Sequence, residues 1–172
     1  MSRLIVDGYN LLHAHPAYAS LIESDIDTAR ARLVADLAGL AQGGRRVVVV
    51  FDGGGNPHSD GTPHHVGKLA VIFSPAGTTA DTVIERLAAR ARSRGEHAIV
   101  VTSDTATRQA VRSGSVSVLT SEHFIEDLTV DAADRHGASR TGVRRVTLAG
   151  RIDPAARDAL ARWARGQGPD AR

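Results

Sequence analysis

Four aspartates follow or precede apolar segments at points where the chain is expected to change direction. Asp7 follows the apolar run at 4–6, Asp52 the run at 47–51, and Asp104 comes soon after the run at 98–101. Asp81 opens a helical pattern in "GTTADTVIERL". The carboxyl ends of parallel strands share one edge of a sheet, and ligands bind there. We therefore expect the four carboxylates to converge.

Such a cluster is unfavourable without a counter-ion. Two carboxylates about 5 Å apart repel by roughly 3 kcal/mol at an effective dielectric constant of about 20. The cluster therefore either takes up protons or binds a cation. The chain has no cysteine, and oxygen ligands favour Mg²⁺ or Mn²⁺ over Zn²⁺. A metal held in this way suits in-line displacement at phosphorus, because it lowers the pKa of bound water.

Three further residues could support this centre. Asn10 could hold a carboxylate or a water through its amide. Ser103 stands beside Asp104, and Glu85 follows Asp81 by one helical turn on the same face. Helix capping is the alternative explanation for Asp81 and Asp104, since each precedes a helical pattern. It does not explain Asp7 and Asp52, which each meet a glycine-containing turn.

The elements that must position these residues alternate along the chain. Short apolar runs at 4–6, 47–51, 69–73, 98–101 and 116–119 are typical of buried strands in a mostly parallel sheet. Helical spacing is found at 26–40 and 83–91, and shorter helices are predicted at 106–112 and after 120–121. Strand alternating with helix predicts a layered α/β fold. The stretch at 53–67 is rich in turn residues and long for a simple connection.

Charge is unevenly distributed. Residues 135–172 hold nine Arg and three Asp, a net charge of +6, whereas residues 1–134 carry −4. A basic tail on an acidic body indicates a polyanionic partner, although a solvated helix face is the simpler alternative.

We predict a catalytic domain at 1–134, then a linker around 136–142 and a basic C-terminal helix that begins at Asp153-Pro154 and docks through Trp163. No apolar run is long enough to span a bilayer, and Asp7 interrupts the only N-terminal one, so a cytoplasmic location is expected.

Together, "LIVDGYNLLHA", "VVVVFDGGG", "GTTADTVIERLA" and "VVTSD" resemble the NYN domain, a nuclease branch related to PIN domains, and most closely its bacterial YacP-like family. The resemblance implies a PIN-like three-layer α/β/α sandwich and a metal-dependent endoribonuclease with mRNA as substrate class and a possible ribosome link. It assigns Asp7, Asp81 and Asp104 to the metal site, with Asn10 and Asp52 beside it. The sequence departs from the family at Thr105, where an aromatic residue often stands, and in the following helix, which lacks the family's tryptophan. Both departures concern partner or substrate recognition, including ribosome docking, and leave the acidic centre intact.

RNA contacts are expected at two places. Arg144, Arg145 and Arg151 supply positive charge in the tail, and His64 and His65 lie in the turn-rich stretch. A second metal site at the loop histidines is a weaker alternative. Two other functions remain open: a catalytically silent RNA-binding module with a PIN-like fold, and a flap-type DNA nuclease, since "VDGYNLL" and "VVFDG" also resemble that relative. The number of metal ions and the oligomeric state cannot be inferred.

Overall fold

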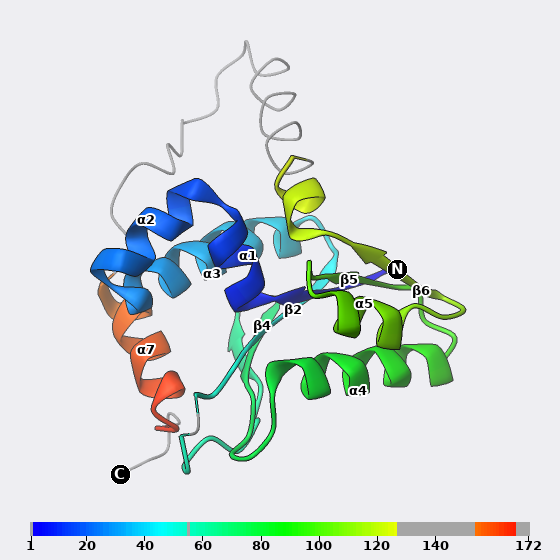
Figure 1. The fold of residues 1–172 in the computed structure, drawn as a ribbon. Coiled ribbons are helices and arrows are strands. Elements are labelled where there is room, and N and C mark those ends of the chain that lie inside the picture. The colour runs from blue at the N-terminus through cyan, green and yellow to red at the C-terminus, as the bar shows by residue number, and fades with distance from the viewer. Residues whose placement is uncertain (1, 55, 127–153, 168–172) are drawn as a thin grey trace.

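The computed structural model describes residues 2–54, 56–126 and 154–167 (Figure 1). Its strands are β1 (Arg3–Asp7), β2 (Arg46–Phe51), β3 (His64–Val66), β4 (Leu69–Phe73), β5 (Ala98–Val101) and β6 (Val116–Leu119). Its helices are α1 (Gly8–Ala14), α2 (Pro16–Ser24), α3 (Ile26–Gln42), α4 (Ala80–Ser93), α5 (Thr105–Val111) and α7 (Pro154–Ala164), with a further helical turn at 121–126.

The strands form one six-stranded sheet in the order β3-β4-β2-β1-β5-β6. Every neighbouring pair is parallel except β3 and β4, which are antiparallel. From β1 the chain proceeds to β2 and β4 on one side and then crosses to β5 and β6 on the other. The direction of winding therefore reverses between β1 and β5. Ligands of such sheets bind at this switch point, outside the carboxyl ends of the strands.

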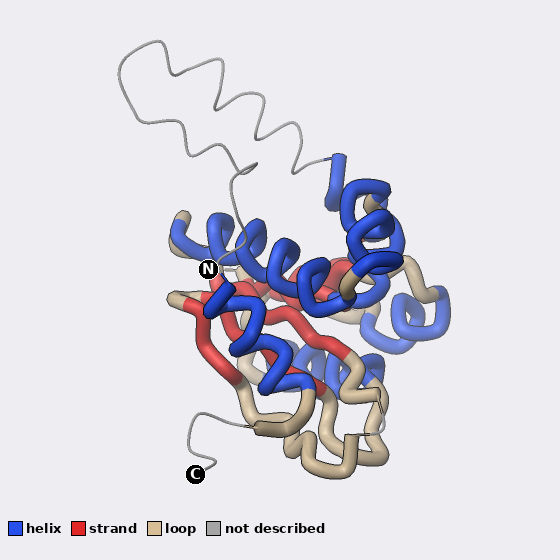
Figure 2. The backbone as a smooth tube through the Cα atoms, turned by 90° about the vertical axis from the view of Figure 1, so that its left-hand side faces the viewer, coloured by secondary structure: helices blue, strands red, loops and turns tan. Residues whose placement is uncertain are grey.

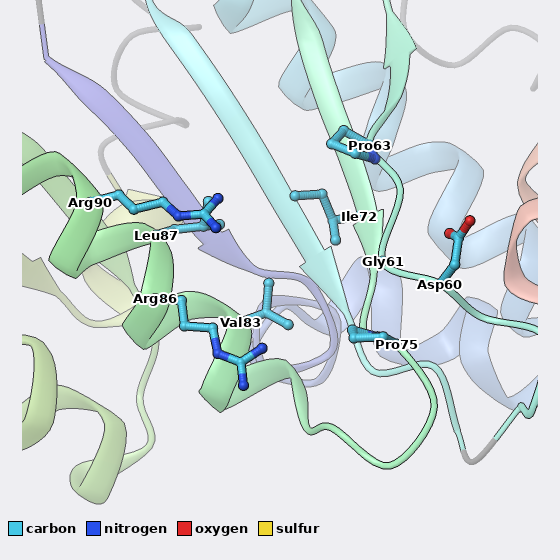
Figure 3. A pocket seen from close by; sticks show the side chains of 9 residues that line it. All are labelled: Asp60, Gly61, Pro63, Ile72, Pro75, Val83, Arg86, Leu87 and Arg90. Atoms are coloured by element: carbon cyan, nitrogen blue, oxygen red, sulfur yellow. The ribbon is translucent and has the colours of Figure 1, made fainter.

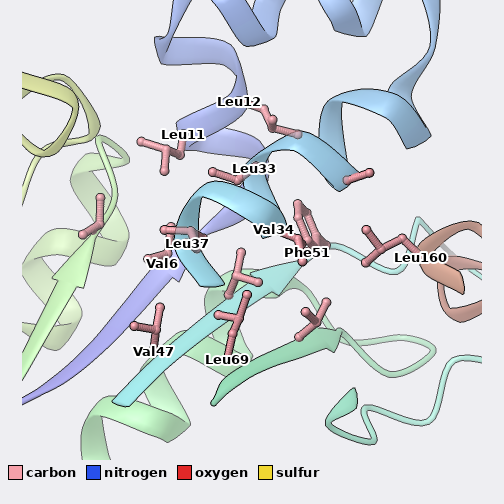
Figure 4. Packing of buried hydrophobic residues seen from close by; sticks show 14 of the residues in the cluster. Val6, Leu11, Leu12, Leu33, Val34, Leu37, Val47, Phe51, Leu69 and Leu160 are labelled. Carbon is pink, nitrogen blue, oxygen red and sulfur yellow. The ribbon is translucent and has the colours of Figure 1, made fainter. Parts of the chain in front are cut away.

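Helices cover both faces of the sheet, which gives the expected three layers (Figures 1 and 2). One core lies under α1, α2, α3 and α7, and Figure 4 shows its central residues, including Leu33, Leu37 and Phe51. A second core lies between the opposite face of the sheet and α4 and α5, around Ile5, Ile84 and Val100. The predicted α/β sandwich with a mostly parallel sheet is confirmed.

The five strands predicted from apolar runs are all present, and each has buried residues, although in the edge strand β6 only Val116 is buried. The helices expected at 26–40, 83–91 and 106–112 are also present, with slightly different ends. Three elements were missed. Strand β3 lies within the turn-rich stretch, and α1 and α2 follow β1 directly, where a glycine turn was expected. Gly8 instead begins α1 next to Phe51, where an added Cβ would lie 2.4 Å from the aromatic ring.

Helix α7 docks on the body as predicted. Leu160 is buried in the same core as α3, and Trp163 packs against that core. Arg157 forms a 2.7 Å ion pair with Asp25, the N-cap residue of α3, so one arginine of the basic tail has a structural partner. The predicted boundary at 134 and the linker around 136–142 lie outside the described residues. In the part of the chain that is described, no helix has the length and apolar character needed to cross a membrane.

Candidate metal centre at the carboxyl edge of the sheet

Asp7 is the most deeply buried of the predicted acids, with 8% of its surface exposed. Its Oδ1 accepts a hydrogen bond from the Asn10 backbone N–H at 3.2 Å, and its Oδ2 accepts one from Thr102 Oγ1 at 3.1 Å. Asp7 therefore caps α1, which corrects the expectation that capping plays no part at this position. Burial raises the pKa of the Asp7 carboxyl above its ordinary value, and the charges of Asp81 and Asp104 raise it further. The two other acids are thus close enough to act on it electrostatically.

Asp104 and Asp81 meet at Thr107. The Thr107 backbone N–H donates to Asp104 Oδ1, and the Thr107 hydroxyl donates to Asp81 Oδ1, each at 2.7 Å. Asp104 is exposed and caps α5, and these bonds from Thr107 lower the pKa of its carboxyl. Asp81 is not a cap, because Thr79 occupies that position in α4. Its side chain is therefore available to the acidic centre.

Two threonines connect the three aspartates through their hydroxyls and the Thr107 backbone N–H. Thr102 Oγ1 donates to Asp7 and accepts the Asp104 backbone N–H at 3.2 Å, and Thr107 then joins Asp104 to Asp81. Both threonines are buried, with at most 2% of their surface exposed. Sequence reasoning missed them, although "TSDTAT" at 102–107 places hydroxyl residues on both sides of Asp104.

Asn10 joins α1 to the segment after β5. Its Oδ1 accepts hydrogen bonds from the Ser103 backbone N–H at 2.8 Å and from Ser121 Oγ at 2.6 Å. Ser103 Oγ in turn donates to Glu122 Oε2 at 2.7 Å, which lowers the pKa of the Glu122 carboxyl. Asn10 thus positions the backbone that leads to Asp104. Neither Ser121 nor Glu122 was predicted, because they come from a distant part of the sequence.

Asp52 connects β2 to α4. Its Oδ1 accepts the Gly54 backbone N–H at 2.8 Å, and its Oδ2 accepts the backbone N–H of Ala80, the first residue of α4, at 3.1 Å. Both carboxylate oxygens are therefore engaged by backbone donors, and Asp52 helps to fix the start of the helix that carries Asp81. Glu85 is exposed one turn further along α4.

The donor set suits a hard cation. Asp81 and Asp104 each use one carboxylate oxygen in hydrogen bonds to described residues, so the other oxygen remains available as a ligand. No three acidic or histidine side chains within residues 2–54, 56–126 and 154–167 lie close enough together to form a compact metal site. Mg²⁺ commonly keeps several waters and binds through only one or two carboxylates. The arrangement therefore fits a hydrated Mg²⁺ or Mn²⁺ ion, and the buried Asp7 adds negative charge beside it.

The predicted RNA-contact residues divide into two groups. His64 stacks on Trp163, with ring centroids 4.5 Å apart and an interplanar angle of 5°, and burial lowers the pKa of its imidazole. His65 is exposed on β3, at the edge of the sheet. Arg144, Arg145 and Arg151 lie outside the described residues. The stacking gives His64 a structural role in docking α7.

Comparison with known proteins gives concordant matches. The family model of the YacP-like NYN domain matches residues 4–165. The uncharacterized protein YacP of Bacillus subtilis (strain 168) is 33% identical over 114 residues, which cover 64% of this chain and 65% of that protein. The chain thus aligns with somewhat less than two thirds of this curated relative.

Two solved structures have similar folds. The crystal structure of Rae1 (YacP) from Bacillus subtilis superposes with a TM-score of 0.65 at 26% identity, covering 81% of this chain and 80% of that one. A tryptophan-to-leucine variant of Rae1 gives the same TM-score at 24% identity, with coverage of 94% and 98%. The NYN domain is a nuclease-like family, and the family model covers nearly all of the present chain. This chain therefore belongs to the YacP-like NYN domain family.

Proposed function

We propose that this protein is a metal-dependent endoribonuclease that hydrolyses phosphodiester bonds in RNA, using Mg²⁺ or Mn²⁺. The observation that carries the proposal is the linked set of Asp7, Asp81 and Asp104 at the switch point of the sheet. Carboxylate oxygens held by hydrogen bonds at the edge where α/β folds bind ligands suit phosphoryl chemistry. Membership of a nuclease-like family supports the same reaction.

Each residue has a role that follows from its contacts. Asp81 and Asp104 would hold the ion through their available oxygens, and the buried Asp7 would strengthen its binding by charge. When bound, the ion lowers the pKa of a water and stabilises negative charge on the phosphate oxygens. Thr102 and Thr107 restrict the positions of the acidic side chains by hydrogen bonds. Asn10 fixes the turn before Asp104, and Asp52 holds the start of α4.

The decisive experiment measures cleavage of structured RNA, unstructured RNA and matching DNA with Mg²⁺, with Mn²⁺ and with a chelator. We expect RNA cleavage that the chelator abolishes. Asp81→Asn should reduce the rate by orders of magnitude, because it removes a metal ligand but preserves the shape of the side chain. Glu23→Gln is the matched control, since it makes the same kind of change at an exposed acid of α2 that has no role in the proposed centre.

Other outcomes of this experiment would assign a different function. RNA binding without cleavage under any metal condition would indicate a silent RNA-binding module. Cleavage of DNA in preference to RNA would indicate the flap-type nuclease. Equal activity in Asp81→Asn and Glu23→Gln would remove Asp81 from the metal site.

The proposal includes mRNA as the substrate class, a cytoplasmic location and association with the ribosome. The mRNA substrate and the ribosome association are supported by the family resemblance alone, and the cytoplasmic location stays a prediction from the sequence. Co-sedimentation of the protein with ribosomes from a cell extract tests the last of them. Helix α5 begins with Thr105 and lacks a tryptophan. If this helix binds the ribosome, it must therefore use other residues than the aromatic residue and the tryptophan of the family pattern. Substitution of exposed α5 residues such as Gln109 provides the corresponding test.

A further inference from the structure

A second feature of the carboxyl edge is a pocket of about 330 Å³ between α4 and the end of β4 (Figure 3). Its volume falls in the range of small-ligand sites, about 300–1,000 Å³. Ile72 from β4 and Val83 and Leu87 from α4 supply apolar surface, and Pro63 and Pro75 add to it from the flanking loops. Ile72 is buried and the other four are partly or fully exposed. The floor of the pocket is therefore suited to a flat or weakly polar group.

Two arginines line one side of this pocket. Arg86 and Arg90 lie one turn apart on α4, so their side chains share a face of the helix. Both are exposed, and neither guanidinium group forms a hydrogen bond or an ion pair with a residue in the described part of the chain. Two other arginines of the body do have such partners: Arg92 donates to the Val111 carbonyl oxygen, and Arg3 pairs with Glu96. Two neighbouring guanidinium groups without partners provide a site for an anion.

The one acid of the pocket lies across from these arginines. Figure 3 shows Arg86 and Arg90 extending from α4 and Asp60 on the opposite side, on the loop that precedes β3. Asp60 Oδ1 accepts the Thr62 backbone N–H at 2.8 Å, and this bond lowers the pKa of its carboxyl. Asp60 therefore stays ionised and committed to its own loop. The pocket is positive along α4 and negative at its far rim.

The pocket and the candidate metal centre lie on different sides of α4, near the same edge of the sheet. Asp81 belongs to the same helix. At about 1.5 Å and about 100° per residue, Arg86 lies about 7.5 Å further along the axis and about 140° around it, and Arg90 about 13.5 Å and about 180°. Pro75 and Gly61, which close the pocket, follow the carboxyl ends of β4 and β2, on the same edge as Asp7 and Asp52. A polymer bound at the acids would reach the pocket by passing around the start of α4.

We propose that this pocket holds one nucleotide of a single-stranded RNA, a few nucleotides away from the scissile bond. Arg86 and Arg90 bind its phosphate, and the apolar floor contacts its ribose and base. The pocket has room for one unstacked base and not for a duplex, and unstacked bases are what proteins read in single-stranded RNA. This inference rests on the proposed function, because the ligand class follows from the reaction proposed for the neighbouring acids.

The test measures binding separately from cleavage. A fluorescently labelled single-stranded oligoribonucleotide is titrated with protein in chelator, so that no cleavage occurs, at several salt concentrations. The double variant Arg86→Ala/Arg90→Ala is expected to bind at least tenfold more weakly than the unmodified protein. Its plot of log affinity against log salt should flatten by about 0.7 for each phosphate contact that is lost.

The matched control is Arg45→Ala/Arg46→Ala. It removes the same charge from two exposed arginines at the start of β2, on the opposite edge of the sheet. It should leave affinity and salt slope close to those of the unmodified protein. Melting temperatures of both variants check the fold, which is expected to persist because none of the four side chains has a partner in the described residues.

Each result has a definite meaning. Unchanged binding in the α4 variant, an equal loss in the control, or no RNA binding by the unmodified protein would overturn the inference. If binding behaves as expected but the unmodified protein does not cleave RNA with either metal, the proposed reaction fails and the nucleotide pocket stands. If cleavage is observed, KM for single-stranded RNA should rise in the α4 variant by more than kcat falls.

Discussion

At the residue scale, the candidate site depends on the unequal environments of its carboxylates. Asp7 is buried and its pKa is raised, whereas Asp104 is exposed and its pKa is lowered by donors on Thr107. Repulsion among the acids is partly offset by the Thr102 and Thr107 hydroxyls, which donate to carboxylate oxygens. The same hydroxyls restrict the positions of the carboxylates, as a metal site requires.

The raised pKa of Asp7 predicts a pH-dependent cost in the metal-free protein. Because the folded state binds the proton more tightly than the unfolded state, stability falls as the pH rises from 3.8 through the raised pKa. Asp7→Asn should remove this cost and still cap α1. We expect its melting temperature in chelator to equal that of the unmodified protein near pH 3 and exceed it at pH 7. A gain of about 1 kcal/mol would appear as roughly 2–4 °C. A lower melting temperature at pH 7 would show that the Asp7 charge is compensated in the fold.

Capping and metal binding can be separated at Asp104. Serine caps helices about as well as aspartate but provides no carboxylate. Asp104→Ser should therefore keep the melting temperature at pH 7 and lose cleavage, whereas Asp104→Ala should lower both. The lowered pKa of Asp104 stabilises the fold above pH 3.8, and this contribution is lost as the pH falls through the lowered value. The serine variant should lack that part of the acid sensitivity. Recovery of cleavage in Asp104→Ser would assign Asp104 to capping alone.

At the element scale, α7 holds the loop that follows Asp52. Asn56 Nδ2 donates to the Ala164 carbonyl oxygen at 2.8 Å, and His64 stacks on Trp163. Gly166, just beyond α7, has a φ of 71°, and a Cβ there would lie 2.4 Å from the His58 carbonyl oxygen. The C-terminal helix therefore supports both the loop and β3.

This close approach predicts the effect of Gly166→Ala. The substitution should separate the end of α7 from the loop, because a backbone contact of 2.4 Å cannot be relieved by a side-chain movement. Gly95→Ala is the matched control, since Gly95 has a φ of 64° and open space around its Cβ position. Gly95→Ala should cost about 1–2 kcal/mol through backbone conformation alone, and Gly166→Ala should cost more. Trp163, the only tryptophan, reports docking by its fluorescence. Equal costs and an unchanged emission spectrum in the two variants would contradict this account.

The elements that sequence reasoning found are those with a strong period or a continuous apolar run. Each continuous apolar run forms a strand of the sheet, and α3 and α4 follow the helical spacing of their apolar residues. Helix α1 was missed because Gly8 and Asn10 are typical of turns, and packing of Gly8 against Phe51 overrides that local preference. Strand β3 has only three residues and is stabilised by pairing with β4. The sequence alone does not show either tertiary contact.

The same limit applies to the site. Strand ends and one helix start were sufficient to place Asp7, Asp81 and Asp104 at one edge, because that follows from parallel topology. The partners of Asn10 could not be predicted, since Ser103 and Ser121 are 93 and 111 residues away in the sequence. Assignment of the caps also needed coordinates: Thr79, two residues before Asp81, caps α4 and leaves Asp81 available.

At the scale of the whole molecule, the positive charge and the acidic centre are in different parts of the sequence. Residues 1–134 carry a net charge of −4 and include the acidic centre, whereas residues 135–172 carry +6. A polyanion that approaches the carboxyl edge therefore meets unfavourable long-range charge, and a bound ion offsets it only within a Debye length of about 8 Å. Arg157 is already paired with Asp25, so the other arginines of the tail are the main candidates for attracting RNA.

The tail prediction can be tested without disturbing α7. Arg144→Glu/Arg145→Glu reverses two charges in a segment before the docked helix. If both arginines contact phosphates, RNA affinity should fall at least tenfold and the salt slope should flatten by about 1.4, at about 0.7 per contact.

Arg45→Glu/Arg46→Glu makes the same change in net charge at the amino edge of the sheet, away from the acidic centre. Residual cleavage at high enzyme concentration should remain metal-dependent in both variants, because neither substitution touches the carboxylates. A tail variant whose affinity and salt slope match those of the unmodified protein would show that the basic tail is a solvated surface. Delivery of RNA would then depend on the arginines of α4.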